Sequence, residues 1–288
     1  MQELHPMAEH SNLRLMAILA HPDDESLGNG GTLARYAAEG IEITLVTATR
    51  GQRGWFGDPA AYPGIEGLGR LREAELHAAA AALGIRDLVV LDYVDGELSR
   101  ADPEAVTCEL VAHIRRVQPQ VVLTFGLDGG YGHPDHMAIS QFTTAAIVRA
   151  ADPRVGHRCT SRGPHSVSKL YHMAISQRHG DAYREAFGDV TMLVDGVERL
   201  PVISPEWLIG ARIDATEHWR AAWRAVQCHR SQLPNFDTLA SMSEPLKRRL
   251  WGSNEYQRVF STVNGGFALE DDLFAGLRPR VATLATAA

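Results

Sequence analysis

Two short motifs in this sequence combine histidine with carboxylates at spacings that suit metal binding. The first reads HPDDE from His21, and the second reads HPDH from His133. Together they could bring His21, Asp24 and His136 to one point and leave one coordination position open. Three nitrogen and oxygen ligands with an open position are typical of a catalytic zinc site, and Fe²⁺ or Mn²⁺ would also suit this set.

A proton acceptor stands directly beside the expected metal ligand. Asp23 is adjacent to Asp24 but would point elsewhere, so it could take a proton from metal-bound water. Each motif also has a simpler interpretation, because the acids of HPDDE could cap the next helix and Asp135 could cap a helix beginning at His136. Two such motifs at one edge of a sheet favour the metal site.

The elements that must position these motifs alternate between strand and helix. Apolar, strand-like segments are separated by segments of helical composition. Strands are expected at 14–20, 41–49, 87–93, 121–125 and 169–176, and helices at 27–40, 72–84 and 103–118. This alternation predicts an α/β fold with a mostly parallel sheet and helices on both faces, a three-layer α/β/α arrangement. Ligand sites in such sheets lie at the carboxyl ends of the strands, where both motifs fall.

A glycine cluster after the first strand raises a rival interpretation. Gly28, Gly30 and Gly31 open a helix, as glycines do in dinucleotide-binding folds, but the G-x-G-x-x-G spacing fails at Leu33. Acids also crowd the place where a pyrophosphate needs positive potential. These glycines are better explained by close packing of the helix that lies behind the loop carrying HPDDE.

Composition excludes several classes of function. The chain has 288 residues, 45% hydrophobic content and a formal net charge of -7, which offers no attraction to nucleic acid. No apolar run approaches the roughly 20 residues that span a bilayer, and no signal-peptide pattern is found, so a cytoplasmic protein without a membrane span is expected. Cys108, Cys159 and Cys228 form no CxxC pair, which predicts neither a disulfide framework nor a thiolate zinc site.

A single domain is expected to cover residues 1–288. It is divided into a core, a C-terminal substrate-cap portion and a frayed tail, at about 13–176, 177–275 and 276–288. The C-terminal region looks irregular apart from a helix near 215–229, and the loops 50–69 and 152–168 could form a lid or a substrate wall. A homo-oligomer is possible, and the sequence does not decide it.

Four segments together resemble the LmbE-like, PIG-L superfamily of zinc-dependent de-N-acetylases. They are AHPDDESLGNGG, RLREAELHAAAAALG, LDYVDGEL and YGHPDH, colinear over roughly Leu15 to Ile147, with a weaker match in AWRAVQCHRSQL. The resemblance implies a Rossmann-like fold and hydrolysis of an acetamide on an N-acetylglucosamine-type sugar. Relatives that act as amidases on larger thiol-sugar conjugates are the main alternative, and a non-catalytic module that binds sugar or nucleotide is another.

The resemblance also implies roles for individual residues. It assigns the zinc ligands His21, Asp24 and His136, the general base Asp23, and His133 with Tyr131 as groups that stabilise the oxyanion or assist the departing amine. Asp135 would hold His133 by a hydrogen bond and favour its protonated form. Arg72 and Asp95 align with positions that contact sugar hydroxyls. His229 and Gln232 also match, without an assigned role.

Several of these assignments keep an alternative. Arg72 could pair with Glu73 or Glu75, Asp95 could be a turn residue, and Tyr131 could pack within its glycine-rich loop. The sequence also departs from the family after the second strand, where Gln52 replaces an acid and is flanked by Arg50 and Arg53. This predicts a more basic wall with Arg53 as a substrate contact, and makes a substrate with a phosphate or carboxylate worth testing.

Overall fold

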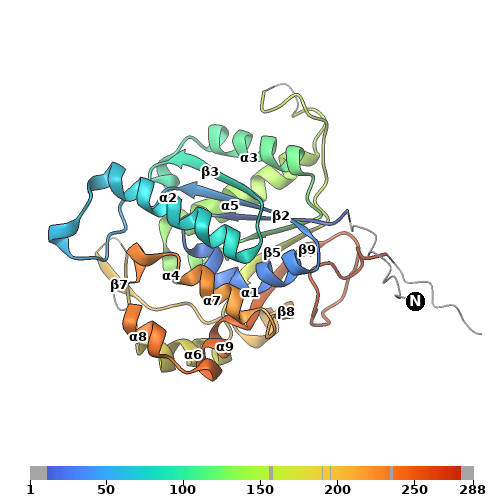
Figure 1. Cartoon of the computed structure of the whole chain (residues 1–288). Helices are drawn as coiled ribbons and strands as arrows, with labels where there is room; N and C mark the ends of the chain where they lie inside the picture. The colour runs from blue at the N-terminus through green and yellow to red at the C-terminus, as the bar shows by residue number, and fades with distance from the viewer. Residues whose placement is uncertain (1–11, 156–157, 190, 195, 234–235, 280–288) are drawn as a thin grey trace, which may run out of the picture.

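A seven-stranded sheet forms the centre of the molecule (Figure 1). The computed structural model describes residues 12–155, 158–189, 191–194, 196–233 and 236–279. The strand order is β3-β2-β1-β4-β5-β9-β8, with β1 to β5 parallel and β9 antiparallel to both neighbours. The strands are β1 Arg14–Leu19, β2 Glu42–Thr49, β3 Asp87–Tyr93, β4 Val121–Thr124, β5 Lys169–Ala174, β8 Ala211–Asp214 and β9 Ser253–Ser261. The predicted, mostly parallel sheet is confirmed.

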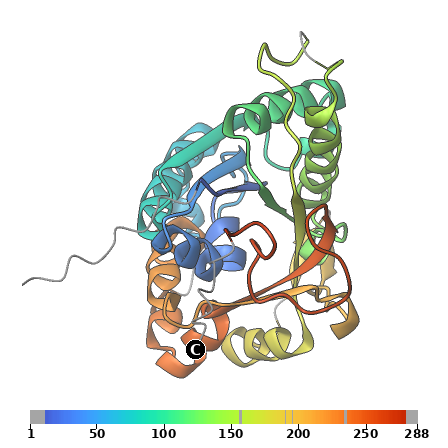
Figure 2. The same ribbon diagram turned by 90° about the vertical axis from the view of Figure 1, so that its right-hand side faces the viewer.

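Helices cover both faces of this sheet. One face packs against α1 Asp24–Ala38, α2 Gly64–Leu83 and α7 Trp219–Val226, and the other against α3 Pro103–Val117 and α5 Pro134–Ala151. Figure 2 shows the sheet between these two groups, which is the predicted three-layer arrangement. The remaining elements are the helices α4 Gly129–Gly132, α6 Gln177–Phe187, α8 Phe236–Ser241 and α9 Glu244–Trp251, and the hairpin of β6 Met192–Val194 and β7 Val197–Arg199.

Local sequence explains several helix boundaries. Helix α1 starts at Asp24, earlier than predicted, and the chain leaves it through Gly40 at φ 82°, a conformation that glycine adopts without strain. Helix α3 starts at Pro103 as predicted, and the Asp102 side chain caps it by accepting from the backbone N–H of Glu104. Helix α7 is shorter than predicted at both ends, and the backbone N–H of Ala215 donates to the carbonyl of Gly252.

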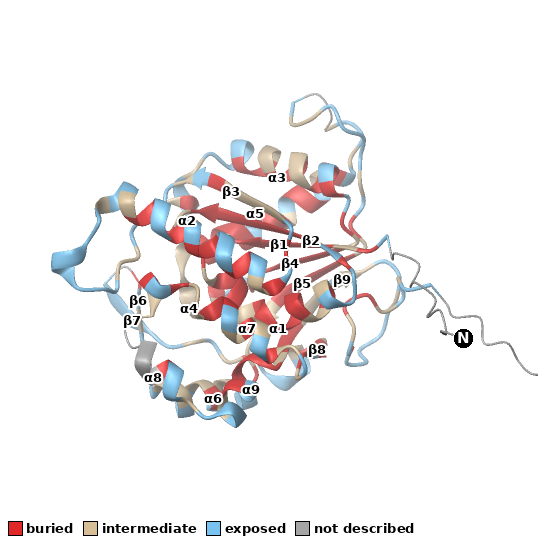
Figure 3. Cartoon of the chain, viewed as in Figure 1, coloured by how far each residue is buried: buried red, intermediate tan, exposed pale blue. Residues whose placement is uncertain are grey.

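The hydrophobic core lies between the sheet and its two helical layers. The central strands β1 and β4 are almost completely buried, which follows from their apolar sequences and from helices on both sides (Figure 3). The region after residue 176, expected to be irregular, supplies β8 and β9 to the same sheet. A second, smaller core of Ala182, Trp219, Val226, Leu250 and Trp251 joins α6, α7 and α9.

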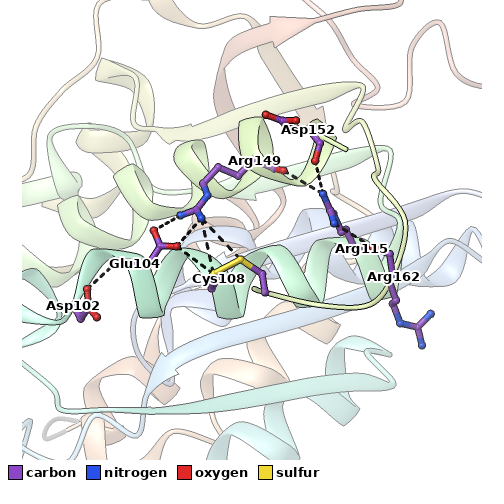
Figure 4. The surroundings of a disulfide bond; sticks show 8 residues. Asp102, Glu104, Cys108, Arg115, Arg149, Asp152 and Arg162 are labelled. Atoms are coloured by element: carbon purple, nitrogen blue, oxygen red, sulfur yellow. Dashed lines mark hydrogen bonds and ion pairs between the residues drawn. A yellow bond between two sulfur atoms is a disulfide. The ribbon is translucent and has the colours of Figure 1, made fainter. Parts of the chain in front are cut away.

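The expectation about cysteines was wrong for two of the three. Cys108 of α3 and Cys159 form a disulfide across 51 positions, with their Cα atoms 4.7 Å apart. Figure 4 shows the disulfide beside Arg149 of α5, which pairs with Glu104 of α3 at 2.7 Å. Because the two cysteines are 51 positions apart and the packing of α3 against α5 brings them together, no local spacing in the sequence predicts this bond.

Two further predictions concerned membrane-spanning segments and the C-terminal tail. No helix in the described part of the chain combines the length and apolarity that a membrane crossing requires. In the expected frayed tail, residues 280–288 lie outside the described residues, whereas Arg278 forms ion pairs with Glu39 and Asp272.

Candidate metal centre and active site

The predicted site residues gather where β1 and β4 lie side by side. The chain leaves β1 toward α1 on one face of the sheet and leaves β4 toward α5 on the other. A crevice at the carboxyl ends of strands forms at such a reversal in parallel sheets. His21 follows β1, Asp95 follows β3, and His136 lies in the first turn of α5.

Three donor atoms converge in this crevice. Nδ1 of His21 lies 3.1 Å from Nε2 of His136, which is 3.6 Å from Oδ1 of Asp24. Oδ2 of Asp24 lies 3.8 Å from Nδ1 of His21. Tetrahedral zinc with ligand distances near 2.0–2.1 Å spaces its ligands by about 3.4 Å. The two imidazole nitrogens lie near this spacing, whereas the Asp24 oxygens lie slightly farther away, and all three side chains are more than 90% buried. Among the described residues, the donor atoms of His21, His133 and His136 also lie within 4.8 Å of one another, as do those of His21, Asp95 and Asp135.

The hydrogen-bond partners of the two imidazoles indicate which nitrogens carry lone pairs. Nε2 of His21 faces the carboxylates of Asp95 at 3.1 Å and Asp135 at 3.2 Å, so it bears hydrogen. Nδ1 of His136 faces the Gly129 carbonyl at 3.0 Å and also bears hydrogen. Two lone pairs would then meet across 3.1 Å, an arrangement that repels unless a cation or a proton lies between them. Such outer partners are the usual way in which metal-binding histidines are oriented.

The pKa values of the two histidines shift in opposite directions. Burial lowers the pKa of His136 and keeps it neutral. Burial also opposes charge on His21, but the hydrogen bonds to Asp135 and Asp95 outweigh it and raise its pKa to about 10. The additional proton would occupy Nδ1, the atom that faces His136, so this position attracts positive charge in either form.

Asp24 is fixed by the backbone that precedes it. Its Oδ2 accepts hydrogen bonds from the backbone N–H groups of His21, at 2.7 Å, and Ala20, at 3.2 Å. Burial raises the pKa of this carboxyl to about 7. A carboxylate that is costly to bury alone is what a bound cation would stabilise.

Asp23 occupies an unusual backbone conformation. Its φ of 107° and ψ of -27° lie in a region that non-glycine residues seldom adopt, and it precedes α1 without capping it through its side chain. The guanidinium of Arg72 donates to Oδ2 of Asp23 at 3.2 Å and to the Pro22 carbonyl at 2.6 Å. Burial raises the pKa of the Asp23 carboxyl, although Arg72 opposes this. A buried carboxyl with a raised pKa is suited to accept a proton near neutral pH.

His133 and Tyr131 border the same cluster. The His133 ring stacks on that of His136 with centroids 4.6 Å apart, and its donor atoms lie within 4.8 Å of those of His21 and His136. Its Nδ1 accepts the backbone N–H of Asp135 at 3.2 Å, which leaves Nε2 to bear hydrogen in the neutral ring. Burial raises the pKa of Tyr131, so this phenol stays protonated and can donate.

The expected bond between the Asp135 carboxylate and His133 is replaced by other contacts. The backbone N–H of Asp135 donates to His133, while its carboxylate accepts from the backbone N–H groups of Gly96 at 2.7 Å and Leu98 at 3.0 Å and faces His21. The reason is geometric, because Asp135 starts α5 and points beneath the site toward the loop after β3. Asp135 therefore supports the imidazole of His21.

The residues predicted to contact sugar also have protein partners. Arg72 is 3% exposed and donates to the carbonyls of Pro22 and Gly51 and to Asp23. Asp95 is 7% exposed and is shared between His21 and the backbone N–H of Arg53. Both residues lie beneath the metal cluster. Their expected contact with a substrate stays a prediction.

The wall after β2 is less basic than its sequence indicates. Arg50 pairs with Glu73 at 2.7 Å and with Asp92, and Arg53 pairs with Glu97 at 2.6 Å. Each arginine therefore already has an acidic partner from another element. This pairing weakens the case for a substrate with a phosphate or carboxylate.

Three features near the site were missed at the level of sequence. The ring of Phe125 stacks on His136 with centroids 3.8 Å apart, and the carbonyl of Gly129 orients the same imidazole. Glu25 is fully buried and pairs with His229, a residue 204 positions away. The only available signal was the presence of Glu25 in HPDDE and of His229 in the weaker C-terminal match.

Comparison with known proteins agrees with the motifs. The family model described as PIG-L, GlcNAc-PI de-N-acetylase, matches residues 16–147. A 1D-myo-inositol 2-acetamido-2-deoxy-alpha-D-glucopyranoside deacetylase of Geodermatophilus obscurus is 34% identical over 289 residues, covering 92% of this chain and 98% of that protein. The catalytic scaffold and the C-terminal region are thus both shared with this relative.

Solved structures with the same fold include different activities. The N,N'-diacetylchitobiose deacetylase of Pyrococcus horikoshii superposes with a TM-score of 0.60 at 20% identity, covering 85% of this chain and 83% of that chain. The 4-carboxy-2-hydroxymuconate hydratase GalB of Pseudomonas putida KT2440 has a TM-score of 0.63 at 21% identity, covering 89% and 100%. These two likenesses establish the fold, and the extended sequence identity establishes the lineage. The chain belongs to the PIG-L family of de-N-acetylases, as its motifs predict.

Proposed function

We propose that this protein is a zinc-dependent hydrolase that removes the N-acetyl group from an N-acetylglucosamine-type sugar. The observation that carries the proposal is the convergence of His21, Asp24 and His136, with two imidazole nitrogens 3.1 Å apart and a carboxylate beside them. The named activity of the relative from Geodermatophilus obscurus makes an N-acetylglucosaminyl inositol the first substrate to test.

His21, Asp24 and His136 would hold the metal ion. A bound divalent cation would polarise the amide carbonyl and make a water molecule more acidic at neutral pH. Zinc is preferred here because its borderline character suits two imidazoles and one carboxylate. The carboxylates of Asp95 and Asp135 would keep the His21 ring oriented for this task.

The side chains of the chain itself supply the proton transfers. Asp23 would accept a proton from the attacking water and later return it to the leaving nitrogen, with His133 as the rival donor. His133, through Nε2–H, and the phenol of Tyr131 would donate hydrogen bonds to the amide oxygen as negative charge develops there. Arg72 would keep the Asp23 carboxylate in place through its contact at 3.2 Å.

Amine release from a panel of amides tests this proposal. The panel contains N-acetylglucosaminyl inositol, simple N-acetylglucosamine glycosides and thiol-sugar conjugates with larger acyl groups, each with added zinc and with chelator. We expect chelator-sensitive release of a primary amine from the acetylated sugars and restoration by zinc. Turnover only of the larger amides would reassign the protein as a conjugate amidase, and no turnover by the zinc-loaded protein would contradict the proposal.

The cellular setting is a separate proposal. We propose a cytoplasmic location, as the sequence predicts. The disulfide between Cys108 and Cys159 argues against it, because such bonds are rare in reducing compartments. Cell fractionation with thiol alkylation before lysis would check both the location and the bond. Analytical ultracentrifugation would likewise decide whether the protein forms the homo-oligomer that the sequence leaves open.

A further inference from the structure

The conformation of Asp23 has to be maintained by its neighbours. A non-glycine residue at φ 107° adopts a strained conformation, so surrounding contacts must hold it there. The carbonyl of Asp23 accepts the N–H groups of Ser26 and Leu27 that begin α1, and its carboxylate receives Arg72. One further contact holds its backbone N–H.

That contact comes from Glu25. Oε2 of Glu25 accepts the backbone N–H of Asp23 at 3.0 Å. In this geometry, the amide of Asp23 turns toward α1 while its carboxylate meets Arg72 on the side of α2. Adjacent Asp24 meets the backbone of His21 instead. The Glu25 contact therefore helps to keep the carboxylates of Asp23 and Asp24 pointing in different directions.

Glu25 is in turn held by a residue from the other end of the chain. Its other oxygen, Oε1, faces Nε2 of His229 at 2.7 Å and receives the hydroxyl of Ser26. Glu25 is fully buried and His229 is 1% exposed, so no water from bulk solvent replaces either partner. A buried carboxylate without its partner is strongly disfavoured. Among the described residues, the imidazole of His229 has its side-chain contacts with Glu25 and Ser26 rather than with His21, Asp24 or His136.

We infer that His229 is a positioning residue that acts through Glu25 to hold Asp23 in the conformation required for proton transfer. The inference rests on the proposed function, since it takes Asp23 as the base. A chain of two hydrogen bonds connects the imidazole of His229 to the backbone of Asp23, and the metal ligands lie outside it. Loss of His229 should therefore impair turnover without releasing the metal.

The decisive variants are His229→Ala and His229→Gln in the zinc-loaded full-length protein. The terminal amide of glutamine can place a donor near the position of Nε2, so His229→Gln keeps the bond to Glu25 and alanine loses it. We expect His229→Ala to lower kcat by about 10- to 100-fold with KM and zinc content unchanged, as for other residues that orient a catalytic group. His229→Gln should recover most of the loss. Full kcat in His229→Ala would overturn the inference.

A neighbouring variant controls for loosening of the C-terminal segment. Ser231 follows closely and donates to Glu75 at 2.6 Å through its hydroxyl, without touching Glu25. Ser231→Ala should lower Tm and leave kcat unchanged. An equal loss of kcat in Ser231→Ala and His229→Ala would show a merely structural effect. If His229→Ala does not fold, His229→Gln is compared with His229→Asn, whose shorter amide cannot reach Glu25.

Coupling to Asp23 is measured by a double-mutant cycle. If His229 acts only through Asp23, the variant with both Asp23→Ala and His229→Ala has the same residual rate as Asp23→Ala alone. Multiplication of the two losses would contradict the inference, because it would show that His229 contributes independently of the base.

Amide hydrogen exchange provides a readout that needs no turnover. The backbone N–H of Asp23 should exchange slowly in the wild-type protein and in His229→Gln, and quickly in His229→Ala, within a peptide that covers residues 20–27. No gain in exchange would overturn the inference whatever the enzyme's substrate. A wild-type protein that hydrolyses no amide, yet shows this gain, would instead refute the proposed function alone.

Discussion

Two adjacent carboxylates in HPDDE differ in their chemistry because the backbone turns between them. Asp24 accepts two backbone N–H groups and points to the two imidazoles, whereas Asp23 has a positive φ and points to Arg72. Burial raises the pKa of both carboxyls, but only Asp24 lies within coordinating distance of His21 and His136. Position relative to the imidazoles, rather than residue type, separates the proposed ligand Asp24 from the proposed base Asp23.

Replacement of the base should separate metal binding from turnover. We expect Asp23→Asn to keep its zinc, because it removes no donor atom, and to lower kcat by about 100- to 10,000-fold, the usual contribution of a general base. Zinc content and kcat measured on the same sample check this. Asp24→Asn is the matched comparison, since the same change one position later should lose the metal. A nearly unchanged rate in Asp23→Asn would remove Asp23 from the proposed reaction.

At the scale of elements, α5 carries the second half of the site. Pro134 stands in its first turn, and His133 caps it by accepting the N–H of Asp135, so the helix begins within the HPDH motif. This start places His136 in the first turn of the helix beside the carbonyl of Gly129. Gly129 has a φ of 64°, which glycine adopts freely and which lets its carbonyl reach the imidazole. Because α5 carries His136 and packs against α3, the position of α5 against α3 also affects the candidate metal site.

The disulfide stabilises this pair of helices and the adjoining loop. Closing a loop across 51 positions should contribute about 2 to 4 kcal/mol, so Cys159→Ser should lower Tm by about 5 to 15 °C. We expect little change in kcat, because neither sulfur contacts the described metal cluster. Cys228→Ser is the control and should leave Tm unchanged. If reductant does not shift the wild-type Tm toward that of Cys159→Ser, the bond contributes no stability.

At the scale of the whole molecule, the segment around Glu270 contacts strands β5 and β9 of the sheet. Glu270 receives the ammonium of Lys169 in β5 at 2.7 Å, the hydroxyl of Tyr171, and the guanidinium of Arg258 in β9 at 3.0 Å. In Figure 2 the red C-terminal segment lies against the sheet beside these strands. This cluster links residues that the sequence assigned to a core and to a cap, so both parts share one sheet.

The Glu270 cluster predicts a stability that declines in acid. Burial opposes charge on Glu270, but the bond from Lys169 outweighs it and lowers the carboxyl pKa below its ordinary 4.5. Burial also lowers the pKa of Lys169, so the positive charge of its ammonium group depends on the neighbouring carboxylate of Glu270. The contribution of Glu270 is therefore complete above about pH 5 and is lost as pH falls through the lower, folded-state value.

Thermal unfolding between pH 3 and pH 7 checks this contribution. Glu270→Gln should have a lower Tm than the wild-type protein at pH 7, and the difference should shrink as the pH falls. Asp271→Asn, next in the chain, is the control and should follow the wild-type curve. A difference that stays constant across this range would show that ionisation of Glu270 does not contribute to stability.

The sequence by itself determined the order of the first five strands with their helices, the family, and the closeness of the HPDDE and HPDH motifs. These features depend on local patterns, because apolar runs and helix boundaries predict a parallel sheet, and such a sheet collects its polar loops at one edge. HPDDE and HPDH therefore needed only the correct strand order to meet. The motif roles remain predictions, but their proximity follows from the topology.

Tertiary structure alone decided which partner each of these side chains has. The Asp135 carboxylate faces His21 while its backbone N–H donates to His133, Arg50 and Arg53 have acidic partners, and Cys108 bonds to Cys159. His229 reaches Glu25 across 204 positions. Each of these contacts joins separate elements at distances and angles that the packing of helices against the sheet sets, so no spacing along the chain encodes them.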